Sequence, residues 1–227
     1  MIDLIKKVIR LSLSLPKTVY FNFSLFEPKT AFKLPVLVDY KTKFYALHRN
    51  TVVLNTKATF GMIKIGWGEG AIGNECNRFS YWTIKENCKV IFNGKAHFAR
   101  GVSLRADNDG QIIFGKNFTA NQNFFCASNT SITFGANILA GWNIHVRDGD
   151  GHTIYDQDNK IINTNKPIKI GSQVWIASYA TILKGVTISD GSIVALGSIV
   201  TKSFSEPNII IGGIPAAVVK KSVHWEK

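Results

Sequence analysis

Apolar residues recur every six positions over the C-terminal third of the chain. The aliphatic positions are Ile170, Ile176, Ile182, Ile188, Val194 and Val200. The position four residues later is also restricted to small or β-branched residues, at Val174, Ala180, Val186, Ser192 and Ser198. This period fits neither an amphipathic helix nor a simple alternating strand. It is typical of a parallel β-helix, in which each short strand buries one aliphatic side chain.

The same rhythm appears with interruptions earlier in the chain. It runs through Phe92, Phe98 and Leu104, then Phe114, Ala120 and Cys126, then Phe134, Ala140 and Val146. Three hexapeptides complete one coil, so residues 18 apart should stack, and residues 51–203 should form about seven or eight coils. Ile170 lies a whole multiple of six after Val146. The Gly- and Asp-containing segment 147–167 is therefore predicted to loop out of a continuous stack.

Both ends of such a stack expose sheet edges and need caps. Residues 1–50 are predicted to cap one end and residues 204–227 the other. The first segment should begin with an amphipathic helix that ends before Pro16 and has Ile5, Val8 and Ile9 on one face. Two roles stay open for this helix, packing over the end of the β-helix and lying on an anionic membrane surface. We expect neither a secretory signal nor a membrane-spanning stretch.

The net charge of +12 favours an anionic partner. The basic residues are dispersed and no nucleic-acid-binding motif accompanies them, so nucleic acid is not the expected partner. The three cysteines, Cys76, Cys88 and Cys126, form no CxxC or Cys/His cluster. The sequence therefore predicts neither a disulfide framework nor a metal site, and it predicts partly buried thiols in a reducing cytoplasm.

Two stretches carry a resemblance to a known family. IGSQVWIASYATILKGVTISDGSIVALGSIVTKS, followed by IIIGGIPAAVVKK, resembles the C-terminal half of hexapeptide-repeat acyltransferases, and among them the maltose/galactoside O-acetyltransferases and their capsular-polysaccharide relatives. The similarity is strong over 134–221 and weaker over 51–133, and PKTVYFNF and AFKLPVLV resemble capsular-group openings. The resemblance implies a left-handed all-β coil, acetyl-CoA as donor, and a homotrimer with active sites between subunits. Left-handedness comes only from the resemblance, because crossovers between parallel strands are usually right-handed.

The segment RDGDGHTIYD places His152 in the predicted loop, where the family has its catalytic histidine. Asp148 and Asp150 flank it, and a carboxylate could orient the imidazole as in a dyad, with Asp148 preferred. Either carboxylate could instead cap a loop turn. His145 is a second histidine that could line the same cleft or be structural.

A donor-binding corner follows from the stacking. Ala177 lies 18 residues before Ala195, and Ser178 lies 18 before Leu196, so backbone groups along this corner could bind the pantetheine arm of acetyl-CoA. By resemblance, the Ser178 amide lies near the thioester carbonyl. By resemblance, Thr201, Lys202 and Lys220 match positions toward the nucleotide end, where phosphate needs cations, and phosphate binding would rest on Lys220 and Lys221. Trp175 could wall the donor-binding corner or only pack at a turn of the coil.

Two positions depart from the family pattern. Ala177 replaces a usual glycine, and Ala217 stands where a basic residue is frequent. For the acceptor, the resemblance of Ala120-Asn121-Gln122-Asn123 to the sugar acetyltransferases suggests Asn121. Trp142 could stack on a sugar ring. Both residues could instead serve only the coil corner.

The sequence thus predicts an acetyl-CoA-dependent O-acetyltransferase that uses direct transfer and a histidine base. Its acceptor would be a sugar hydroxyl of capsule, exopolysaccharide or lipopolysaccharide biosynthesis, lipid- or nucleotide-linked. The expected location is the cytoplasm or the inner face of the membrane, with peripheral membrane contact as one option. An amino-sugar N-acetyltransferase and a non-catalytic scaffold are the alternatives. A metal-dependent carbonic anhydrase site is not expected, because it needs three histidines and only His145 and His152 are close in sequence.

Overall fold

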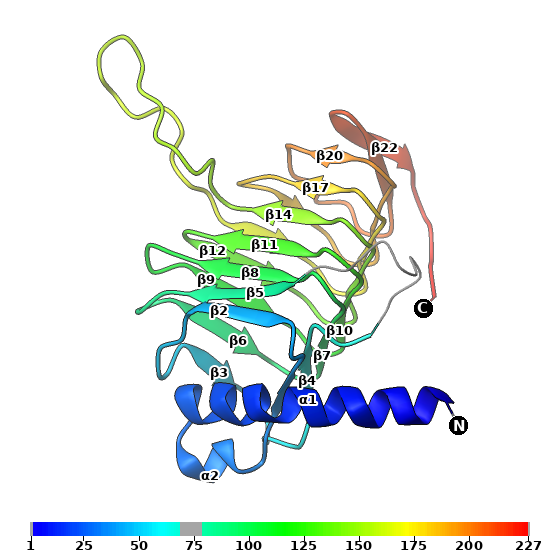
Figure 1. Cartoon of the computed structure of the whole chain (residues 1–227). Coiled ribbons are helices and arrows are strands. Elements are labelled where there is room, and N and C mark those ends of the chain that lie inside the picture. The colour runs from blue at the N-terminus through cyan, green and yellow to red at the C-terminus, as the bar shows by residue number, and fades with distance from the viewer. Residues whose placement is uncertain (1, 69–78, 227) are drawn as a thin grey trace.

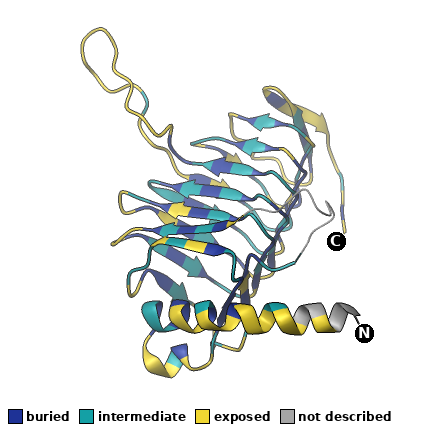
Figure 2. Ribbon diagram, in the orientation of Figure 1, coloured by how far each residue is buried: buried dark blue, intermediate teal, exposed yellow. Residues whose placement is uncertain are grey.

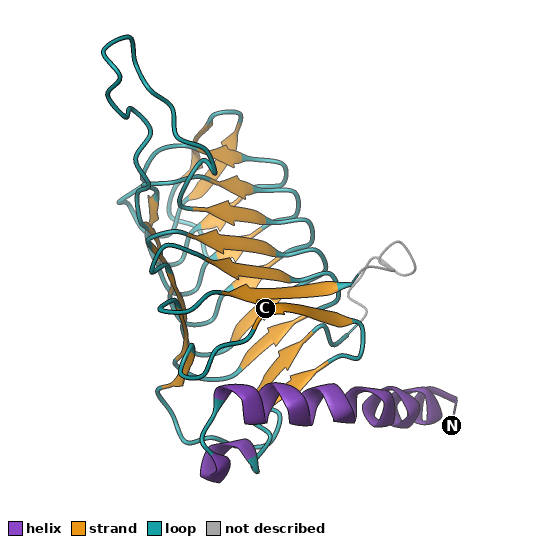
Figure 3. Ribbon diagram, turned by 60° about the vertical axis from the view of Figure 1, so that its left-hand side comes forward, coloured by secondary structure: helices purple, strands orange, loops and turns teal. Residues whose placement is uncertain are grey.

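The computed structural model of the chain describes residues 2–68 and 79–226; Cys76 lies outside the described residues. Successive strands pass in turn through three sheets, which we call A, B and C, and every neighbouring pair within the stack is parallel (Figure 1). Figure 3 shows the strands of one sheet lying one above another along the stack. The predicted parallel β-helix is therefore confirmed.

Three parallel stacks account for the strands of the described residues. Sheet A contains β1 (Val36–Val38), β4 (Ile63–Ile65), β7 (Ala96–Phe98), β10 (Phe118–Ala120), β13 (Leu139–Ala140), β16 (Trp175–Ile176), β19 (Ile193–Val194), β21 (Ile210–Gly213) and the antiparallel β22 (Ala216–Lys220). Sheet B contains β2 (Thr42–Ala46), β5 (Ser80–Ile84), β8 (Ser103–Ala106), β11 (Phe125–Ser128), β14 (His145–Arg147), β17 (Thr181–Ile182) and β20 (Ile199–Val200). Sheet C contains β3 (Val52–Leu54), β6 (Lys89–Phe92), β9 (Gln111–Phe114), β12 (Ser131–Phe134), β15 (Ile168–Ile170) and β18 (Thr187–Ile188).

The six-residue period sets the register in the C-terminal coils. Ile170 pairs with Ile188, 18 residues later, and Ile182 pairs with Val200 in the same way. The earlier coils are longer, because Phe92 pairs with Phe114 and Phe114 pairs with Phe134. Extra corner residues account for this difference. The expected spacing of 18 therefore holds only for the C-terminal coils.

The core runs the length of the stack, and phenylalanines fill its wider part. Phe92, Phe114 and Phe134 lie in one column with ring centroids 5.3 Å apart for each neighbouring pair. Phe118 meets the Phe114 ring edge to face at 4.6 Å. Figure 2 shows the buried positions alternating along the strands. Large rings suit the longer coils, whereas the 18-residue coils are filled by isoleucine, valine and alanine.

The stack begins earlier than the boundary at residue 51 that the sequence predicts. β1 pairs with β4 from Val36 onward, and β2 pairs with β5. At the other end, β21 adds to sheet A beyond residue 203. The first coil escaped prediction because Pro35 and aromatic residues obscure its period. Residues 36–50 and 210–213 thus belong to the stack rather than to the caps.

A long helix, α1 (Ile2–Leu25), lies across the N-terminal end of the stack and is followed by the short α2 (Pro28–Ala31) (Figure 1). The expectation that the helix ends before Pro16 is wrong. Pro16 removes a hydrogen bond to the carbonyl of Ser12, but both residues are exposed, so water can solvate that carbonyl.

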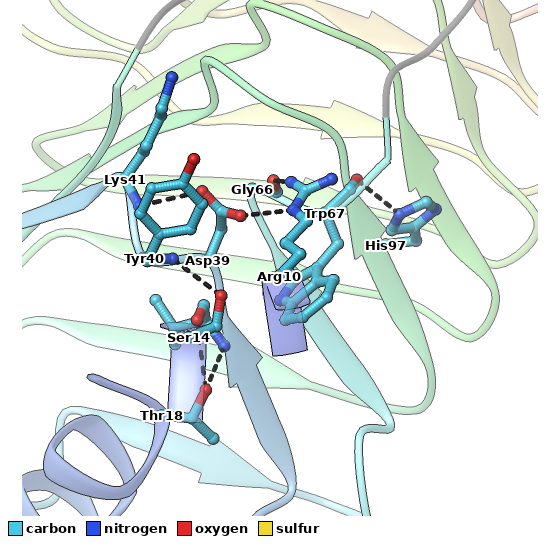
Figure 4. A network of polar contacts seen from close by, with 10 residues as sticks. Arg10, Ser14, Thr18, Asp39, Tyr40, Lys41, Gly66, Trp67 and His97 are labelled. Carbon is cyan, nitrogen blue, oxygen red and sulfur yellow. Dashed lines mark hydrogen bonds and ion pairs between the residues drawn. The ribbon is translucent and has the colours of Figure 1, made fainter. Parts of the chain in front are cut away.

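The polar face of α1 packs against the stack. The side chains of Asn22 and Thr18 each exchange hydrogen bonds with the free backbone edge of β1, at Val36 and Val38. Figure 4 shows the continuation of this contact, in which the Ser14 hydroxyl accepts from the Tyr40 amide. α1 thus caps the edge strand with side-chain hydrogen bonds in place of another strand.

An ion pair completes this cap. The Arg10 guanidinium donates to the Asp39 carboxylate at 2.6 Å and to the Gly66 carbonyl at 2.6 Å, and it lies 5.1 Å from the centre of the Trp67 ring (Figure 4). The predicted apolar face points the other way. Ile5, Val8 and Ile9 are all more than half exposed, so the cap is made by the polar side of the helix.

Candidate functional site

The predicted loop is present as an arm, residues 147–167, that leaves the stack between β14 and β15 (Figure 1). The stack continues across it without a change of register. In sheet C, Phe134 of β12 pairs with Ile170 of β15, which follows the arm. In sheet B, Val146 of β14, which precedes the arm, pairs with Ile182 of β17. The arm is therefore an insertion into one coil and does not disturb the strands that carry it.

Asp148 anchors the base of the arm. Its buried carboxylate accepts hydrogen bonds from the Ser128 hydroxyl, the Asn129 amide, and both the amide and the hydroxyl of Thr130, at 2.7–3.0 Å. The preferred dyad of Asp148 with His152 is not formed in the chain. The carboxylate instead takes the turn-capping role that the sequence left open.

His152 lies on the exposed part of the arm, and its backbone is fixed by Asn163. The Asn163 side chain donates to the His152 carbonyl at 2.7 Å and to the Asp150 carboxylate at 3.0 Å. Asp150 is also paired with the Lys184 ammonium, and this hydrogen bond holds the pKa of the Asp150 carboxyl below its ordinary value. Asp150 is thus the ionised carboxylate that shares a partner with His152.

The outer part of the arm is a narrow two-stranded excursion. Tyr155 and Ile161 form an antiparallel bridge, and the turn between them is held by Asp156, whose carboxylate accepts from the amides of Asp158 and Lys160. Four large apolar side chains on it are more than half exposed: Ile154, Tyr155, Ile161 and Ile162. This excursion has a defined shape and an apolar surface that the chain itself does not cover.

A second region gathers most of the predicted binding residues. The turns that join sheet A to sheet B stack on one another in successive coils and form what we call the A/B corner, residues 121–124, 141–144, 177–180 and 195–198. Asn121, Trp142, Ser178 and Leu196 lie in consecutive turns of this corner. Residues that are separated by up to 75 positions in sequence are therefore brought into one column.

The backbone amides of the A/B corner divide into two kinds. Those of Ala177 and Ala195 donate to carbonyls of the next coil at 2.8 Å, so the stack uses them. The amides of Ser178 and Leu196, one coil apart, donate to no acceptor in the described part of the chain. The predicted binding groups therefore narrow from four residues to these two amides.

Gly141 keeps the approach to Ser178 open. A Cβ atom at position 141 would come within 2.7 Å of the Ser178 amide nitrogen and 2.6 Å of its hydroxyl oxygen. The Ser178 hydroxyl accepts from the Trp142 amide at 3.2 Å, which fixes the turn. The corner thus holds a backbone N–H beside a position that only glycine can occupy without displacement.

Trp175 lies on sheet A beside the A/B corner and is 37% exposed. Its ring is 6.1 Å from that of Trp225, whose indole N–H donates to the Gln173 carbonyl at 2.9 Å. The C-terminal residues therefore fold back along this face. Trp175 thus lies beside the C-terminal tail and stays partly exposed.

The residues predicted to bind phosphate lie at the C-terminal end of the stack. Thr201, Lys202 and Lys220 are exposed. Lys221 is paired with Glu206 at 2.7 Å, so its charge already has a partner. Lys220 is accordingly the stronger candidate of the two adjacent lysines for binding a phosphate.

His145 is the first residue of β14 and is half-buried beside the A/B corner. Its ring meets the Phe125 ring edge to face at 4.4 Å. Burial, with a smaller contribution from the Arg147 charge, lowers the pKa of His145, and its Nε2 atom finds no partner among the described residues. Because this nitrogen is itself buried, it is closed to a ligand in the conformation of the single chain.

The arm and the A/B corner lie on different sides of one chain. The corner joins sheet A to sheet B, whereas the arm joins sheet B to sheet C, and Figure 3 shows the arm projecting away from the stack. The structure therefore brings Asn121, Trp142, His145 and Ser178 together, but it does not bring His152 to them within one chain.

Two residues that hold the arm were missed from the sequence, Asn163 within it and Lys184 outside it. Lys184 falls where Asp148 falls one coil earlier, because Val146 pairs with Ile182. Counting positions across the insertion could have found it. Asn163 gave no signal, because its partners His152 and Asp150 lie across a loop of irregular shape.

Within 2–68 and 79–226, no three His, Cys, Asp or Glu side chains are grouped so that they could hold a metal ion. None of the described helices has the length and apolarity needed to cross a membrane.

Comparisons with known proteins place the fold. No protein-family model matches the sequence, and no curated protein matches it. Among solved structures, the polySia specific acetyltransferase NeuO matches 85% of this chain and 89% of its own, at 24% identity and a TM-score of 0.51.

Two further solved structures match with lower TM-scores. The polysialic acid O-acetyltransferase OatWY matches 85% of this chain and 69% of its own, at 22% identity and a TM-score of 0.46. A hexapeptide-repeat containing acetyltransferase from Vibrio cholerae O1 biovar eltor, solved with acetyl coenzyme A, matches 52% of this chain and 64% of its own, at 27% identity and a TM-score of 0.45. The chain has the left-handed parallel β-helix fold that is found in hexapeptide-repeat acetyltransferases.

Proposed function

We propose that this protein is an acetyl-CoA-dependent O-acetyltransferase that acts on a sugar hydroxyl. The observation that carries the proposal is the A/B corner, where the unused Ser178 amide lies beside Gly141 and Trp142. A backbone N–H held rigidly in a stack is a suitable donor to the oxygen of a thioester carbonyl. The acetyltransferases of the same fold, one of them solved with acetyl coenzyme A, support the same assignment.

The donor would lie along the corner with its phosphates toward the C-terminal end of the stack. The amides of Ser178 and Leu196 are one coil apart, close to 5 Å, and offer two donors to the extended pantetheine arm. Exposed Lys202 and Lys220 lie near that end and suit phosphate groups. Thr201 and Lys221 would lie beside them at the nucleotide end of the donor.

Acetyl-CoA would supply the acetyl group as a thioester. His152 takes the proton from the sugar hydroxyl while its oxygen forms a bond to the carbonyl carbon, because a hydroxyl is almost fully protonated at neutral pH. The Ser178 amide then donates to the negative oxygen of the tetrahedral intermediate. When the carbon–sulfur bond breaks, the His152 imidazolium returns the proton to the departing thiolate.

This chemistry needs two chains. His152 is on the arm, and the corner of the same chain lies on another side, so the arm must reach the A/B corner of a partner subunit. The exposed apolar side chains Ile154, Tyr155, Ile161 and Ile162 provide a surface that such a contact would bury. We therefore propose a cyclic homotrimer in which each site takes its base from one subunit and its donor corner from the next.

The acceptor would lie between the arm and the corner. Trp142 offers a ring face for a sugar and Asn121 an amide. His145 would join them only after its buried Nε2 atom became exposed. Acceptors of capsule, exopolysaccharide and lipopolysaccharide synthesis are made on lipid or nucleotide carriers, so we place the enzyme in the cytoplasm or at the inner face of the membrane. An amine in place of the hydroxyl would use the same base and donor.

Mixing two inactive variants tests the proposal. His152→Ala removes the base, and Leu196→Glu puts a negative charge on an exposed corner residue, where it should repel the anionic donor. Each homotrimer should release little thiol from acetyl-CoA with a sugar acceptor. Refolding the two chains together at equal amounts should restore about one quarter of the wild-type sites, because one interface in four then pairs an intact arm with an intact corner.

The outcomes separate the possibilities. No recovery in the mixture would contradict a site shared between subunits. Thiol release with amino sugars, but with no hydroxyl acceptor, would make the enzyme an N-acetyltransferase. No release with any acceptor, together with no binding of CoA by calorimetry, would leave the scaffold alternative.

A further inference from the structure

The N-terminal helix has its polar and apolar faces reversed relative to a normal surface helix. The side facing the stack carries Arg10, Ser14, Thr18 and Asn22, all of which hydrogen-bond to the stack (Figure 4). Surface helices of globular proteins usually turn their apolar stripe inward. Here a large part of the apolar side is left for another partner.

The outward face of α1 is a continuous apolar surface. Ile5, Ile9 and Leu13 are spaced by four residues and are 52%, 54% and 54% exposed, so they form one stripe along the helix. A parallel stripe contains Val8, Leu15 and Val19, which are 38–55% exposed, and Tyr20 is 61% exposed. Scattered exposed apolar residues are ordinary, but a surface that follows one helix over four turns is not.

This face points away from the stack along its axis. α1 bonds to the free edge of β1, and the edge groups of a terminal strand point along the direction in which the strands are stacked. The opposite side of α1 therefore forms the end surface of the molecule, as Figure 2 shows by the exposed positions along the helix. In the proposed trimer, copies that meet side by side would bring their α1 faces to one common plane.

A protruding aromatic residue extends the surface. Phe32 follows α2, is 76% exposed, and meets the Phe23 ring edge to face at 5.0 Å. Exposed Lys29 and Lys33 flank it in sequence. An apolar anchor between two cations matches the chemistry of an anionic membrane surface, where lipid tails lie just below negative head groups.

The charge of the chain favours the same occupant. The net charge is +12, and the acidic groups described near this end already have partners, since Asp39 is paired with Arg10 and Glu27 with Arg49. A second copy docked on this end surface would bring its own Lys29 and Lys33 against the same two lysines and would be repelled there. An anionic bilayer would be attracted, and three coplanar faces would bind it with higher avidity than one.

We infer that the outer face of α1, together with Phe32, docks the protein onto an anionic membrane surface. The helix lies in the plane of the interface and does not cross it, and its polar side stays bound to β1. This surface is separate from the arm and from the A/B corner, so it does not depend on the proposed chemistry.

Vesicle partitioning of the full-length protein tests the inference. Vesicles of phosphatidylglycerol and phosphatidylcholine should bind the wild type, vesicles of phosphatidylcholine alone should bind it less, and salt should weaken the anionic binding. Ile9→Gln with Leu13→Gln should lower the partition coefficient by about tenfold or more, because two exposed side chains lose their burial in lipid. The matched control is Val218→Gln with Val219→Gln, two exposed valines at the other end of the stack, which should bind as the wild type does.

Substitution of the two lysines is an independent test of the inference. Lys29→Gln with Lys33→Gln should lower binding to anionic vesicles by roughly 25-fold and leave binding to neutral vesicles unchanged. The altered residues are exposed, so thermal unfolding should match the wild type. Failure of the wild type to bind anionic vesicles would overturn the inference, as would equal binding by the Ile9→Gln, Leu13→Gln variant. A third outcome would identify a second copy as the occupant. In that case the wild type would bind no vesicles and would associate further in light scattering, and the Ile9→Gln, Leu13→Gln variant would abolish that association.

Discussion

The arm and the A/B corner are built by opposite means. The corner is rigid because every turn is tied to the next coil by backbone hydrogen bonds, and its binding groups are backbone amides that the stack leaves unused. The arm is tied down at its base by Asp148 and carries its candidate base, His152, on an exposed segment. In the proposed function, donor binding therefore needs only the corner of one chain, whereas proton transfer needs the arm of a neighbouring chain.

The largest expected effect removes the base on the arm. His152→Ala should lower kcat by roughly 10²–10⁴-fold, the range for a positioned general base, while CoA affinity stays within about threefold. The control is Thr153→Ala, an exposed neighbour on the same arm, which should keep wild-type turnover. If the His152 variant kept more than about a tenth of wild-type turnover, the base would belong to the corner side, with His145 as the next candidate.

The second prediction compares the losses of stability when the Asp148 and the Asp150 carboxylates are removed. Asp148→Ala should lower the free energy of unfolding by about 2–4 kcal/mol, because two backbone amides and two hydroxyls lose a buried charged acceptor. Asp150→Ala removes a partly exposed ion pair and should cost less than about 1 kcal/mol. Urea unfolding measures both. A stable Asp148 variant with the activity loss of His152→Ala would instead restore the dyad.

The third effect tests the corner at its nucleotide end. Lys220→Glu should weaken CoA binding by about 1–3 kcal/mol in calorimetry, the scale of a charge-assisted contact. Lys57→Glu, the same charge change at an exposed site in an early coil, should have little effect. Lys221→Glu should have less effect than Lys220→Glu, because Lys221 already pairs with Glu206. Unchanged affinity in the Lys220 variant would remove the phosphates from this end.

The smallest effect concerns His145, between the two regions. Burial disfavours its charged form, so the folded pKa lies below the ordinary value near 6.5. The unfolded chain then binds the proton more readily, and this contribution to stability is present above pH 6.5 and is lost as the pH falls through the folded pKa. His145→Phe should remove that part of the decline, measured as the change in unfolding free energy between pH 7.5 and pH 5. An identical decline in wild type and variant would place the titration elsewhere.

The C-terminal coils could be predicted residue by residue, because a six-residue period with small residues at the corners is a local property of the sequence. Ile170 and Ile188 pair as that period requires. The strand pairing of the wider coils could not be predicted in this way. Extra residues at corners, such as Asn108 and Asp109, change the coil length without changing the strands. The stacking of Ala177 on Ala195 and of Ser178 on Leu196 at the A/B corner followed from the same spacing of 18 residues.

The errors arose where a distant contact decided the role of a residue. Asp148 was placed beside His152 from their separation of four residues, but the amides at 129 and 130, one coil earlier, take its carboxylate. Pro16 was taken as the end of α1, but its lost hydrogen bond faces water. The sequence left open which side of α1 faces the stack, and the structure turns the polar side inward because the edge of β1 needs hydrogen-bond partners.

The way α1 closes the stack also protects the protein from end-to-end polymerisation. A coil that ends in an open strand is a template on which another chain can continue the sheet, and repetition of that step would give a fibre. The Thr18 and Asn22 side chains of α1 occupy the edge of β1 and block the addition of another strand to it. A chain shortened to begin after Leu25 would keep most of its coils, but it would present β1 as a seed for end-to-end polymerisation.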